Sequence, residues 1–269
     1  MTLLLASIPS PVDPVMVTVF GVGIRWYAVF ILSGIAAGLW LVRRLAAARG
    51  LDPEFPLDIA PWLVLVGIAG ARLTYVLLKA PYFTLHPAEA LNIRLGGLSI
   101  HGALIASAIA LIVLCRSRGQ SALVWSDLLV AGVALGQAIG RWGNWANQEA
   151  FGRPTSMPWG LEIDPAHRPQ EFAEFATFHP TFLYESIFNL LNAAVLCWVV
   201  LAIGKDRFRP GAALWTYLLT YGIGRLIIER LRTDSLYIGP LPGATWASIA
   251  AILVGAIMLA RSLRKVAVD

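Results

Sequence analysis

The sequence is poor in charge. Only 14% of its 269 residues are Asp, Glu, Lys or Arg, 58% are hydrophobic, and the mean hydropathy is +0.69. Soluble domains carry about 25% charged residues, so this composition excludes an ordinary soluble fold. The net charge of +5 does not indicate nucleic-acid binding, because the basic residues form short clusters between apolar runs. That arrangement is typical of membrane proteins.

Cysteine and metal-ligand clusters are also lacking. Cys115 and Cys197 stand singly within apolar runs, which excludes a disulfide framework and favours inert packing thiols. No group of His, Asp, Glu and Cys has the spacing of a metal site, so we expect no metal ion and no other cofactor. An internal repeat, which many transporters possess, is missing as well.

Apolar runs close to the 17–25 residues that cross a bilayer as a helix recur along the chain. The expected fold class is an all-α membrane protein, with seven transmembrane helices in one bundle and a single polytopic domain over residues 1–269. The expected spans are about Trp26–Leu45, Ile59–Leu78, Leu98–Cys115, Leu123–Gly140, Phe182–Ile203, Gly211–Ile228 and Thr245–Leu259.

Basic residues predict the orientation. They follow spans one, three, five and seven, at Arg43, Arg44, Arg49, Arg116, Arg118, Lys205, Arg207, Arg209, Arg261, Arg264 and Lys265. Alternating spans place all of them on one side, which the positive-inside rule makes cytoplasmic. The N-terminus then lies outside, in the periplasm, and the C-terminus in the cytoplasm. The polar segment 142–180, between spans four and five, is expected to form a small external cap.

Glycines recur every four residues in two of the spans. Gly132, Gly136 and Gly140 share one ridge of span four, and Gly34 with Gly38 does the same in span one. Ridges of small residues let helices approach closely in lipid. We interpret these glycines as packing positions.

Segment Gly140–Gly152, GRWGNWANQEAFG, is the densest group of polar residues. Its hydrogen-bonding side chains are Arg141, Asn144, Asn147, Gln148 and Glu149. A charged guanidinium beside apolar sequence needs a partner, because an unpaired charge out of water is costly. A helix end reaching water would explain an isolated Arg. Five polar side chains between glycines favour a polar ligand.

Other ionisable residues within the spans leave alternatives open. Arg72 fits a structural ion pair about as well as a ligand contact. His101 is either a hydrogen-bonded packing residue or a proton acceptor. Tyr221, Arg225 and Glu229 are four residues apart and share a helix face. Arg225 and Glu229 either neutralise each other or hold an anion.

The predicted topology brings these residues to one depth of the membrane. The set expected near the outer side is Tyr27, Arg72, His101, Arg141, Glu149, His179, Arg225 and Glu229. Although Arg25-Trp26-Tyr27 by itself is typical of a headgroup anchor, this convergence favours a shared pocket. Guanidinium groups match phosphate geometry and apolar walls suit acyl chains, so the expected ligand is a phospholipid.

The segment Gly140–Gly152 resembles the signature of bacterial prolipoprotein diacylglyceryl transferases, Gly-Arg-x-Gly-Asn-Phe-x-Asn-x-Glu-x-x-Gly, with Trp145 in the Phe position. The resemblance covers about Ile24 to Arg232. Its other landmarks are Arg25-Trp26-Tyr27, Ser99-Ile100-His101-Gly102, His179-Pro180-Thr181 with Tyr184-Glu185, and Tyr221-Gly222 through Arg225 to Glu229.

The resemblance implies an enzyme of the bacterial plasma (inner) membrane whose active site faces the outer leaflet. Such an enzyme moves the diacylglyceryl group of phosphatidylglycerol onto the lipobox cysteine of a preprolipoprotein. It forms a thioether, releases glycerol phosphate and carries out the first step of lipoprotein maturation.

The resemblance also suggests roles for individual residues. His101 is the candidate base for the substrate thiol, and Arg141 and Arg225 would stabilise the leaving phosphate, with Arg141 gripping the lipid phosphate. Asn144 and Glu149 would orient the headgroup or Arg141. The remaining substrate-binding candidates are Glu229, Tyr27, Tyr221 and Gly152. Glu229 would orient Arg225, and the two tyrosines would bind glycerol hydroxyls. Gly152 ends the signature.

Two other functions compete with this hypothesis. A lipid or anion transporter could use the same arginines, but it would need polar residues in both halves of the membrane. The inner halves of the spans are expected to be almost purely apolar, which argues against it. Another phospholipid-dependent headgroup transferase would have a similar pocket, and only the signature distinguishes it from this hypothesis.

Overall fold

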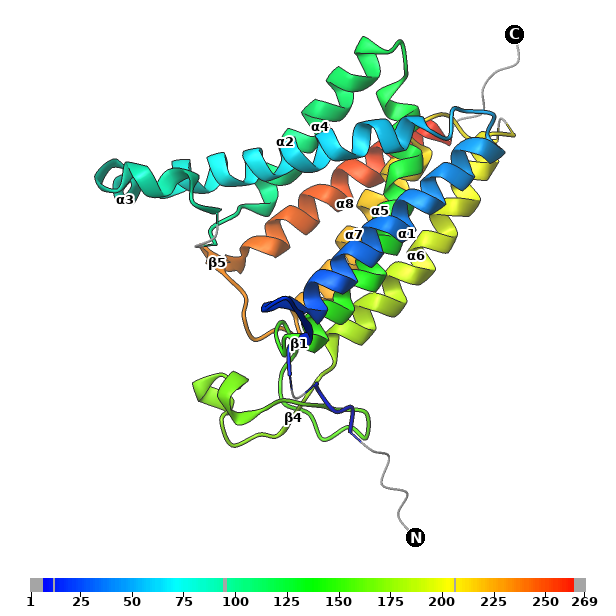
Figure 1. The fold of residues 1–269 in the computed structure, drawn as a ribbon. Coiled ribbons are helices and arrows are strands. Elements are labelled where there is room, and N and C mark those ends of the chain that lie inside the picture. The colour runs from blue at the N-terminus through cyan, green and yellow to red at the C-terminus, as the bar shows by residue number, and fades with distance from the viewer. Residues whose placement is uncertain (1–6, 12, 94–95, 206, 264–269) are drawn as a thin grey trace. The chain divides into compact units, whose positions relative to one another are not determined.

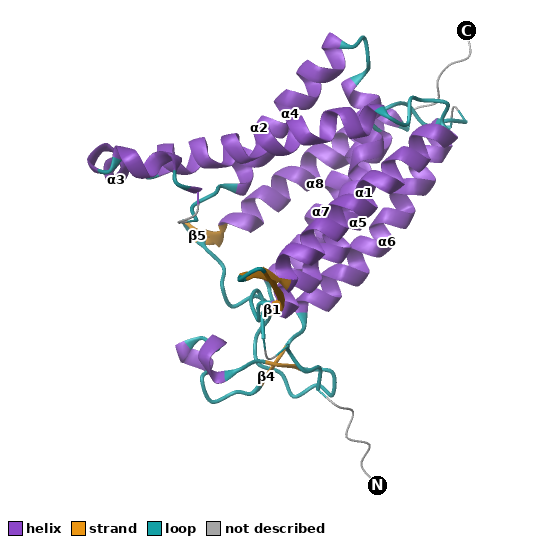
Figure 2. Ribbon diagram, in the orientation of Figure 1, coloured by secondary structure: helices purple, strands orange, loops and turns teal. Residues whose placement is uncertain are grey.

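The fold is almost entirely helical, with three short two-stranded ribbons (Figure 2). The structure is a computed structural model that describes residues 7–11, 13–93, 96–205 and 207–263, so Arg264 and Lys265 of the last basic cluster lie outside the described residues. Six of the described helices are long and apolar enough to cross a membrane. They are α1 (Trp26–Ala48), α2 (Phe55–Leu78), α4 (Ile100–Ser117), α5 (Ala122–Ala146), α6 (Thr181–Ile203) and α8 (Gly243–Ser262).

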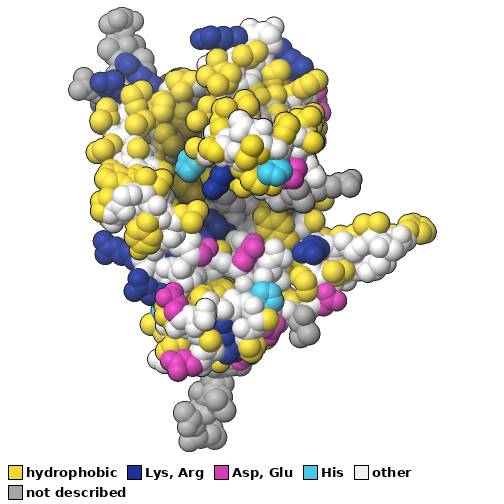
Figure 3. Space-filling model, turned by 90° about the vertical axis from the view of Figure 1, so that its left-hand side faces the viewer, with side chains coloured by type: hydrophobic (Ala, Val, Ile, Leu, Met, Phe, Trp, Pro, Cys, Tyr) yellow, Lys and Arg dark blue, Asp and Glu magenta, His cyan; other side chains and the backbone are white. Residues whose placement is uncertain are grey.

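The composition of the surface agrees with a helical membrane protein. Figure 3 shows hydrophobic side chains over much of one face of the molecule, while charged side chains gather in separate groups. Trp40, Trp62 and Trp198 are each more than half exposed although they lie within long apolar helices. Exposed apolar area on this scale marks contact with lipid or protein rather than water.

Helix α7 (Ala212–Glu229) occupies the position of the expected sixth span but is not among the six apolar helices. Polar side chains recur along its 18 residues, at Thr216, Tyr217, Thr220, Tyr221, Arg225 and Glu229. These polar side chains lower the mean hydropathy of the helix, and Arg225 and Glu229 among them form an ion pair. The count of seven spans therefore stays a prediction.

The chain forms two compact units, and the smaller one comprises Gly50–Trp125. In it α2 packs closely on α4. A Cβ atom on Gly70 would lie 2.8 Å from the carbonyl oxygen of Gly102, and one on Gly102 would lie 2.4 Å from that of Gly70. The short helix α3 (Ala80–Leu85) and the 3-10 helix η1 (Pro87–Leu91) follow α2.

The larger unit comprises the described parts of residues 1–49 and 126–269. Helices α1, α5 and α6 lie side by side in it, and α7 packs against both α6 and α8 (Figure 1). The predicted glycine ridges meet each other, because Gly34 faces Gly136 and Gly38 faces Gly132. This confirms that these glycines are packing positions.

The larger unit also contains the three ribbons. Strands β1 (Val15–Val19) and β2 (Val22–Arg25) form a hairpin that leads into α1. The segment between α5 and α6 carries β3 (Leu161–Glu162), η3 (Pro165–His167), η4 (Gln170–Phe172) and β4 (Thr177–Phe178), and β5 (Tyr237–Ile238) with β6 (Leu241–Pro242) precedes α8. A core of Phe151, Leu161, Ile163 and Phe178, together with Phe182 of α6, makes the α5–α6 segment a folded element.

The contact between α1 and α5 predicts the effect of one added methyl group. A Cβ on Gly38 would lie 2.7 Å from the carbonyl oxygen of Gly132, so Gly38→Ala must push two backbones apart and should lower stability by about 1–3 kcal/mol. Gly140→Ala is the matched control, because its Cβ would lie 3.5 Å from the flexible end of Ile31. Thermal unfolding in detergent should show a lower midpoint for Gly38→Ala alone; equal midpoints would contradict the packing.

Candidate functional site

The carboxylate of Glu185 lies between two arginines of the larger unit. Its Oε2 is 2.5 Å from Nη2 of Arg141, and its Oε1 is 3.8 Å from Nη1 of Arg232. The Glu185 side chain is only 8% exposed, so its charge needs these partners. Arg141 lies five residues before the end of α5, Glu185 lies four residues after the start of α6, and Arg232 lies three residues after α7. The cluster therefore joins the terminal regions of three helices.

The signature residues extend this cluster through hydrogen bonds. Nη1 of Arg141 donates to Oδ1 of Asn144 at 3.4 Å, and Nδ2 of Asn144 donates to Oε1 of Glu149 at 3.0 Å. Asn147 also donates to Oε1 of Glu149, at 3.4 Å. Asn144 and Glu149 therefore stand where they can orient Arg141, one of the two orienting roles expected of them.

Helix α5 continues to Ala146, six residues beyond the expected end at Gly140. The extension is stable because its polar side chains have partners: Arg141 pairs with Glu185, and Trp142 donates from Nε1 to the hydroxyl of Ser186 at 3.2 Å. The signature thus starts on a helix, and only its second half is loop.

The loop half of the signature reverses direction at two strained residues. Gln148 and Ala150 have φ of 50° and 57°, a left-handed conformation that costs a residue with a side chain about 1–2 kcal/mol. At this turn the amide of Glu149 donates to the carbonyl of Asn144, near the end of α5, at 3.0 Å. Buried Gln148 holds the turn by donating to Asp164 at 2.6 Å.

Gly152 lies where three chain segments cross. Its amide donates to the carbonyl of His179 at 2.9 Å, and a Cβ would lie 2.7 Å from Cβ of His179 and 3.1 Å from the carbonyl oxygen of Leu231. This close approach explains why the signature ends in glycine. Its expected part in substrate binding stays a prediction.

Arg225 and Glu229 form the ion pair that their spacing suggested. Nη2 of Arg225 lies 2.6 Å from Oε2 of Glu229, and Ser235 donates to Oε1 of Glu229 at 2.6 Å. Nη1 of Arg225 is buried and has no hydrogen-bond partner among the described residues. Mutual neutralisation is therefore real, but it leaves one guanidinium nitrogen able to donate.

The two tyrosine candidates occupy different surroundings. Tyr27 packs against Gly143, where a Cβ would lie 2.8 Å from its ring, and is 39% exposed. Tyr221 stacks on Tyr217 with ring centroids 5.5 Å apart, and the Tyr217 hydroxyl donates to Gln137 at 3.2 Å. The expected binding of glycerol hydroxyls by Tyr27 and Tyr221 stays a prediction.

His101 belongs to the smaller unit, in the first turn of α4, with an exposed side chain. Ser99 caps this helix and accepts from the amide of Gly102 at 3.5 Å. The local structure therefore presents the imidazole at a helix N-terminus rather than burying it in packing. Its approach to Arg141, which lies in the other unit, stays a prediction.

Arg72 has a structural role. Its guanidinium donates to the carbonyls of Glu89, Ala90, Gly96 and Gly97 at 2.6–3.0 Å. It is 7% exposed and lies over the ring of Phe83 at 5.3 Å. These carbonyls occupy its donors, so of the two alternatives the structure favours the structural one, with backbone carbonyls in place of an acidic partner.

Several buried polar residues were missed from the sequence. Glu185 was named only within a family landmark, and Arg232 only as the end of the resemblance. Glu185 carried a signal of its own, because it is an ionisable residue inside an apolar helix. Asn189 and Asn192 continue the polar face of α6 below Glu185, and both are at least 96% buried. Asp127, at the other end of α5 from Arg141, is fully buried.

Under the predicted orientation, Asp127 is a polar exception within an inner half that is expected to be almost purely apolar. Its carboxylate accepts from the amides of Gly211 and Leu214, at 2.6 and 2.9 Å, at the start of α7. A helix N-terminus attracts negative charge, so this residue caps α7 inside the bundle. The polar residue thus fixes a helix and does not line a transport path.

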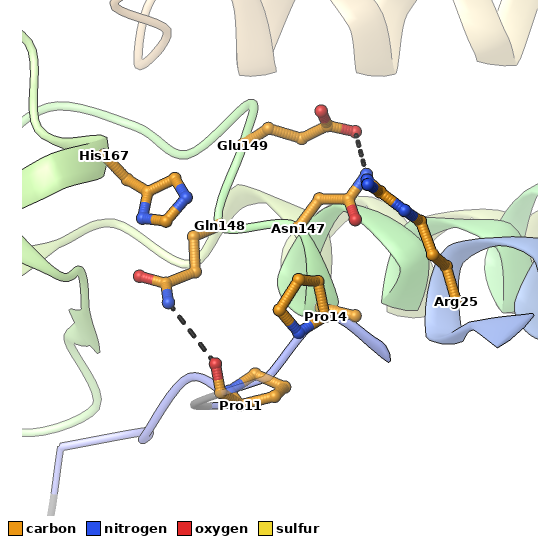
Figure 4. A pocket seen from close by; sticks show the side chains of 8 residues that line it. Pro11, Pro14, Arg25, Asn147, Gln148, Glu149 and His167 are labelled. Atoms are coloured by element: carbon orange, nitrogen blue, oxygen red, sulfur yellow. Dashed lines mark hydrogen bonds between the residues drawn. The ribbon is translucent and has the colours of Figure 1, made fainter. Parts of the chain in front are cut away.

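A small cavity of about 250 Å³ lies beside the signature loop. Its polar lining includes Arg25, Asn147, Glu149 and His167. Figure 4 shows the Asn147 and Glu149 side chains meeting on one side, while Gln148 points to the carbonyl of Pro11. Among the described residues, no group of three or more His, Cys, Asp or Glu side chains is arranged to hold a metal ion.

The ion pairs of Glu185 predict a stability difference between two acidic residues. Glu185→Ala leaves two partly buried arginines without their shared carboxylate and should cost about 3 kcal/mol. Asp234→Ala, the control, removes a carboxylate that is 50% exposed on Arg232 and should cost less than about 1 kcal/mol. Thermal unfolding in detergent should show a larger loss of stability for Glu185→Ala than for Asp234→Ala. Equal losses would contradict the importance of the buried position of Glu185.

Known proteins are similar to this chain over most of its length. The family described as "Prolipoprotein diacylglyceryl transferase" matches residues 14–261. A Gloeobacter violaceus protein is 45% identical over 91% of this chain and 91% of its own length. A Synechococcus elongatus protein is 44% identical over 96% of this chain and 90% of its own length. A Trichormus variabilis protein is 41% identical over 95% of this chain and 91% of its own length. Each is named phosphatidylglycerol–prolipoprotein diacylglyceryl transferase. The chain therefore belongs to the prolipoprotein diacylglyceryl transferase family.

Proposed function

We propose that this protein is a transferase that moves the diacylglyceryl group of phosphatidylglycerol to the lipobox cysteine of a preprolipoprotein. Family membership and the names of relatives that are 41–45% identical over most of the chain support this activity. The observation that carries it is the signature arginine, Arg141, held at a helix end by Glu185 and Asn144. The reaction is the first step of lipoprotein maturation.

The guanidinium donors of the cluster suit a phosphodiester. Three partly buried arginines, Arg141, Arg225 and Arg232, face two buried carboxylates, Glu185 and Glu229. Asp234, which is half exposed, pairs with Arg232 and balances the third positive charge. The phosphate of phosphatidylglycerol would therefore bind through guanidinium donors that the carboxylates leave free, such as Nη1 of Arg225.

The reaction forms a carbon–sulfur bond and breaks a carbon–oxygen bond. The thiolate of the substrate cysteine attacks the glyceryl carbon, and the electron pair of the broken bond leaves with glycerol phosphate. The thiol proton, whose ordinary pKa is about 8.5, goes to a base, for which we assign His101. The departing phosphate gains a second negative charge, and Nη1 of Arg225 is a buried donor able to receive it.

The other signature residues would position the lipid. Arg141 grips the phosphate, Asn144 and Glu149 orient Arg141 or the headgroup, and Glu229 orients Arg225. For the glycerol hydroxyls we assign Tyr27 and Tyr221, and we place Gly152 next to the substrate because the backbone there has no side chain in the way. The proposed site uses no metal ion or other cofactor.

We further propose a seven-span topology in which α7 crosses the membrane in addition to the six apolar helices. The N-terminus lies outside and the C-terminus in the cytoplasm of a bacterial cell, so the site opens toward the outer leaflet of the inner membrane. Residues 1–269 form one polytopic domain, with 142–180 as an external cap. The basic clusters after spans one, three, five and seven support this orientation.

Transfer activity tests the proposed residues. Purified protein, labelled phosphatidylglycerol and a lipobox peptide should yield a thioether-linked lipid. Arg141→Ala should lower kcat/KM at least about 100-fold, because it removes a charged donor to the phosphate, and His101→Gln should abolish transfer.

Matched controls come from the same parts of the chain. Arg153→Ala and His86→Gln alter exposed side chains near the signature and in the smaller unit, and both should leave turnover within about twofold. Near-normal turnover of Arg141→Ala or His101→Gln would remove that residue from the site. Lipid flux across vesicles without any thioether product would favour the transporter alternative.

A further inference from the structure

The β1–β2 hairpin exposes apolar side chains on both faces. From Val15 to Ile24 it contains no charged residue. Its exposed side chains are Met16 (46%), Val17 (45%), Val19 (42%), Phe20 (100%), Val22 (67%) and Ile24 (38%). An uncharged hairpin of this kind is prone to aggregate in water, so it requires an apolar or amphipathic environment.

The turn of this hairpin places its largest side chain at a costly position. Phe20 and Gly21 connect the strands with φ of 49° and 79°. Hairpin turns with two positive φ values favour Asn, Asp or Gly, and the left-handed conformation is unfavourable for other residues. Because the Phe20 ring is fully exposed, no contact within the described chain offsets this cost. A contact between Phe20 and a group outside the chain would offset this cost.

The hairpin is attached directly to a membrane-type helix. Strand β2 ends at Arg25 and α1, one of the six apolar helices, begins at Trp26. The amide of Trp26 donates to the carbonyl of Pro14 at 3.1 Å, which fixes the base of the hairpin to the helix start. Arg25, Trp26 and Tyr27 are residue types of the membrane interface, so the hairpin begins at headgroup depth.

Backbone hydrogen bonding limits how deep the hairpin can lie. A two-stranded ribbon leaves amides and carbonyls unpaired along both outer edges, and the hydrocarbon core offers these groups no hydrogen-bond partners. The headgroup region contains water and phosphate groups that satisfy them. We propose that the β1–β2 hairpin lies in the headgroup region at the N-terminal end of α1 and inserts Phe20 toward the acyl chains.

Site-specific fluorescence tests the proposed lipid contact. The full chain, with Cys115 and Cys197 replaced by alanine, is given a single cysteine as Phe20→Cys, labelled with an environment-sensitive dye and reconstituted into vesicles of phosphatidylethanolamine and phosphatidylglycerol. Phe175→Cys, at a 43% exposed ring in the α5–α6 segment, is the matched control. Brominated acyl chains should quench the dye at position 20 several-fold more than at 175, and iodide on both sides of the membrane should do the reverse.

A second variant separates the ring from the fold of the hairpin. Phe20→Asn creates the Asn-Gly turn that this geometry prefers, so the strands should stay paired while the inserted ring is lost. A dye on Val22→Cys should then lose at least half of its quenching by brominated lipid. The proposal is overturned if iodide reaches positions 20 and 175 equally, if Phe20→Asn leaves the quenching unchanged, or if the dye at position 20 becomes shielded only when a lipobox peptide is added.

Discussion

The shared carboxylate of Glu185 is the interaction on which the larger unit depends most. It holds the end of α5 through Arg141 and the chain after α7 through Arg232. A buried ion pair adds little net stability compared with apolar packing, but leaving one charge without its partner is costly. The ends of three helices are therefore fixed relative to one another. The signature loop leaves α5 at this point and returns beside Arg232, where Gly152 forms a bridge.

Close helix packing makes this arrangement possible. The glycine pairs Gly34–Gly136 and Gly38–Gly132 bring α1 against α5 along two turns. Two turns further toward the start of α1, the ring of Tyr27 packs against Gly143. The start of α1 therefore lies beside the signature, and the hairpin before it shares a cavity with the signature loop through Arg25 and Pro14. Small residues deep in the helices thus position polar residues at their ends.

The helices could be predicted from the sequence because long apolar runs leave few alternatives in lipid. The expected spans Trp26–Leu45 and Phe182–Ile203 differ from α1 and α6 by at most three residues at either end. The end of α5 could not be placed, because its last turn is stabilised by Glu185 and Ser186, about 40 residues later in the chain.

The signature showed which polar residue types the site contains, but it did not show which side chains pair with one another. Sequence spacing indicated the Arg225–Glu229 pair because both residues share one helix face. The partner of Arg141 depends on how α5 and α6 pack, and spacing along one helix carries no such information. Arg72 shows the same limit, since its partners are backbone carbonyls that no residue type reveals.

The most direct test is whether Arg141 contacts the lipid phosphate. Solid-state NMR can measure dipolar coupling between 15N in arginine side chains and 31P of phosphatidylglycerol in vesicles containing the full chain. The account predicts coupling that corresponds to hydrogen-bond distance in the unmodified protein and its loss or marked weakening in Arg141→Lys. Absence of coupling in the unmodified protein, or coupling of equal strength in Arg141→Lys, would contradict it.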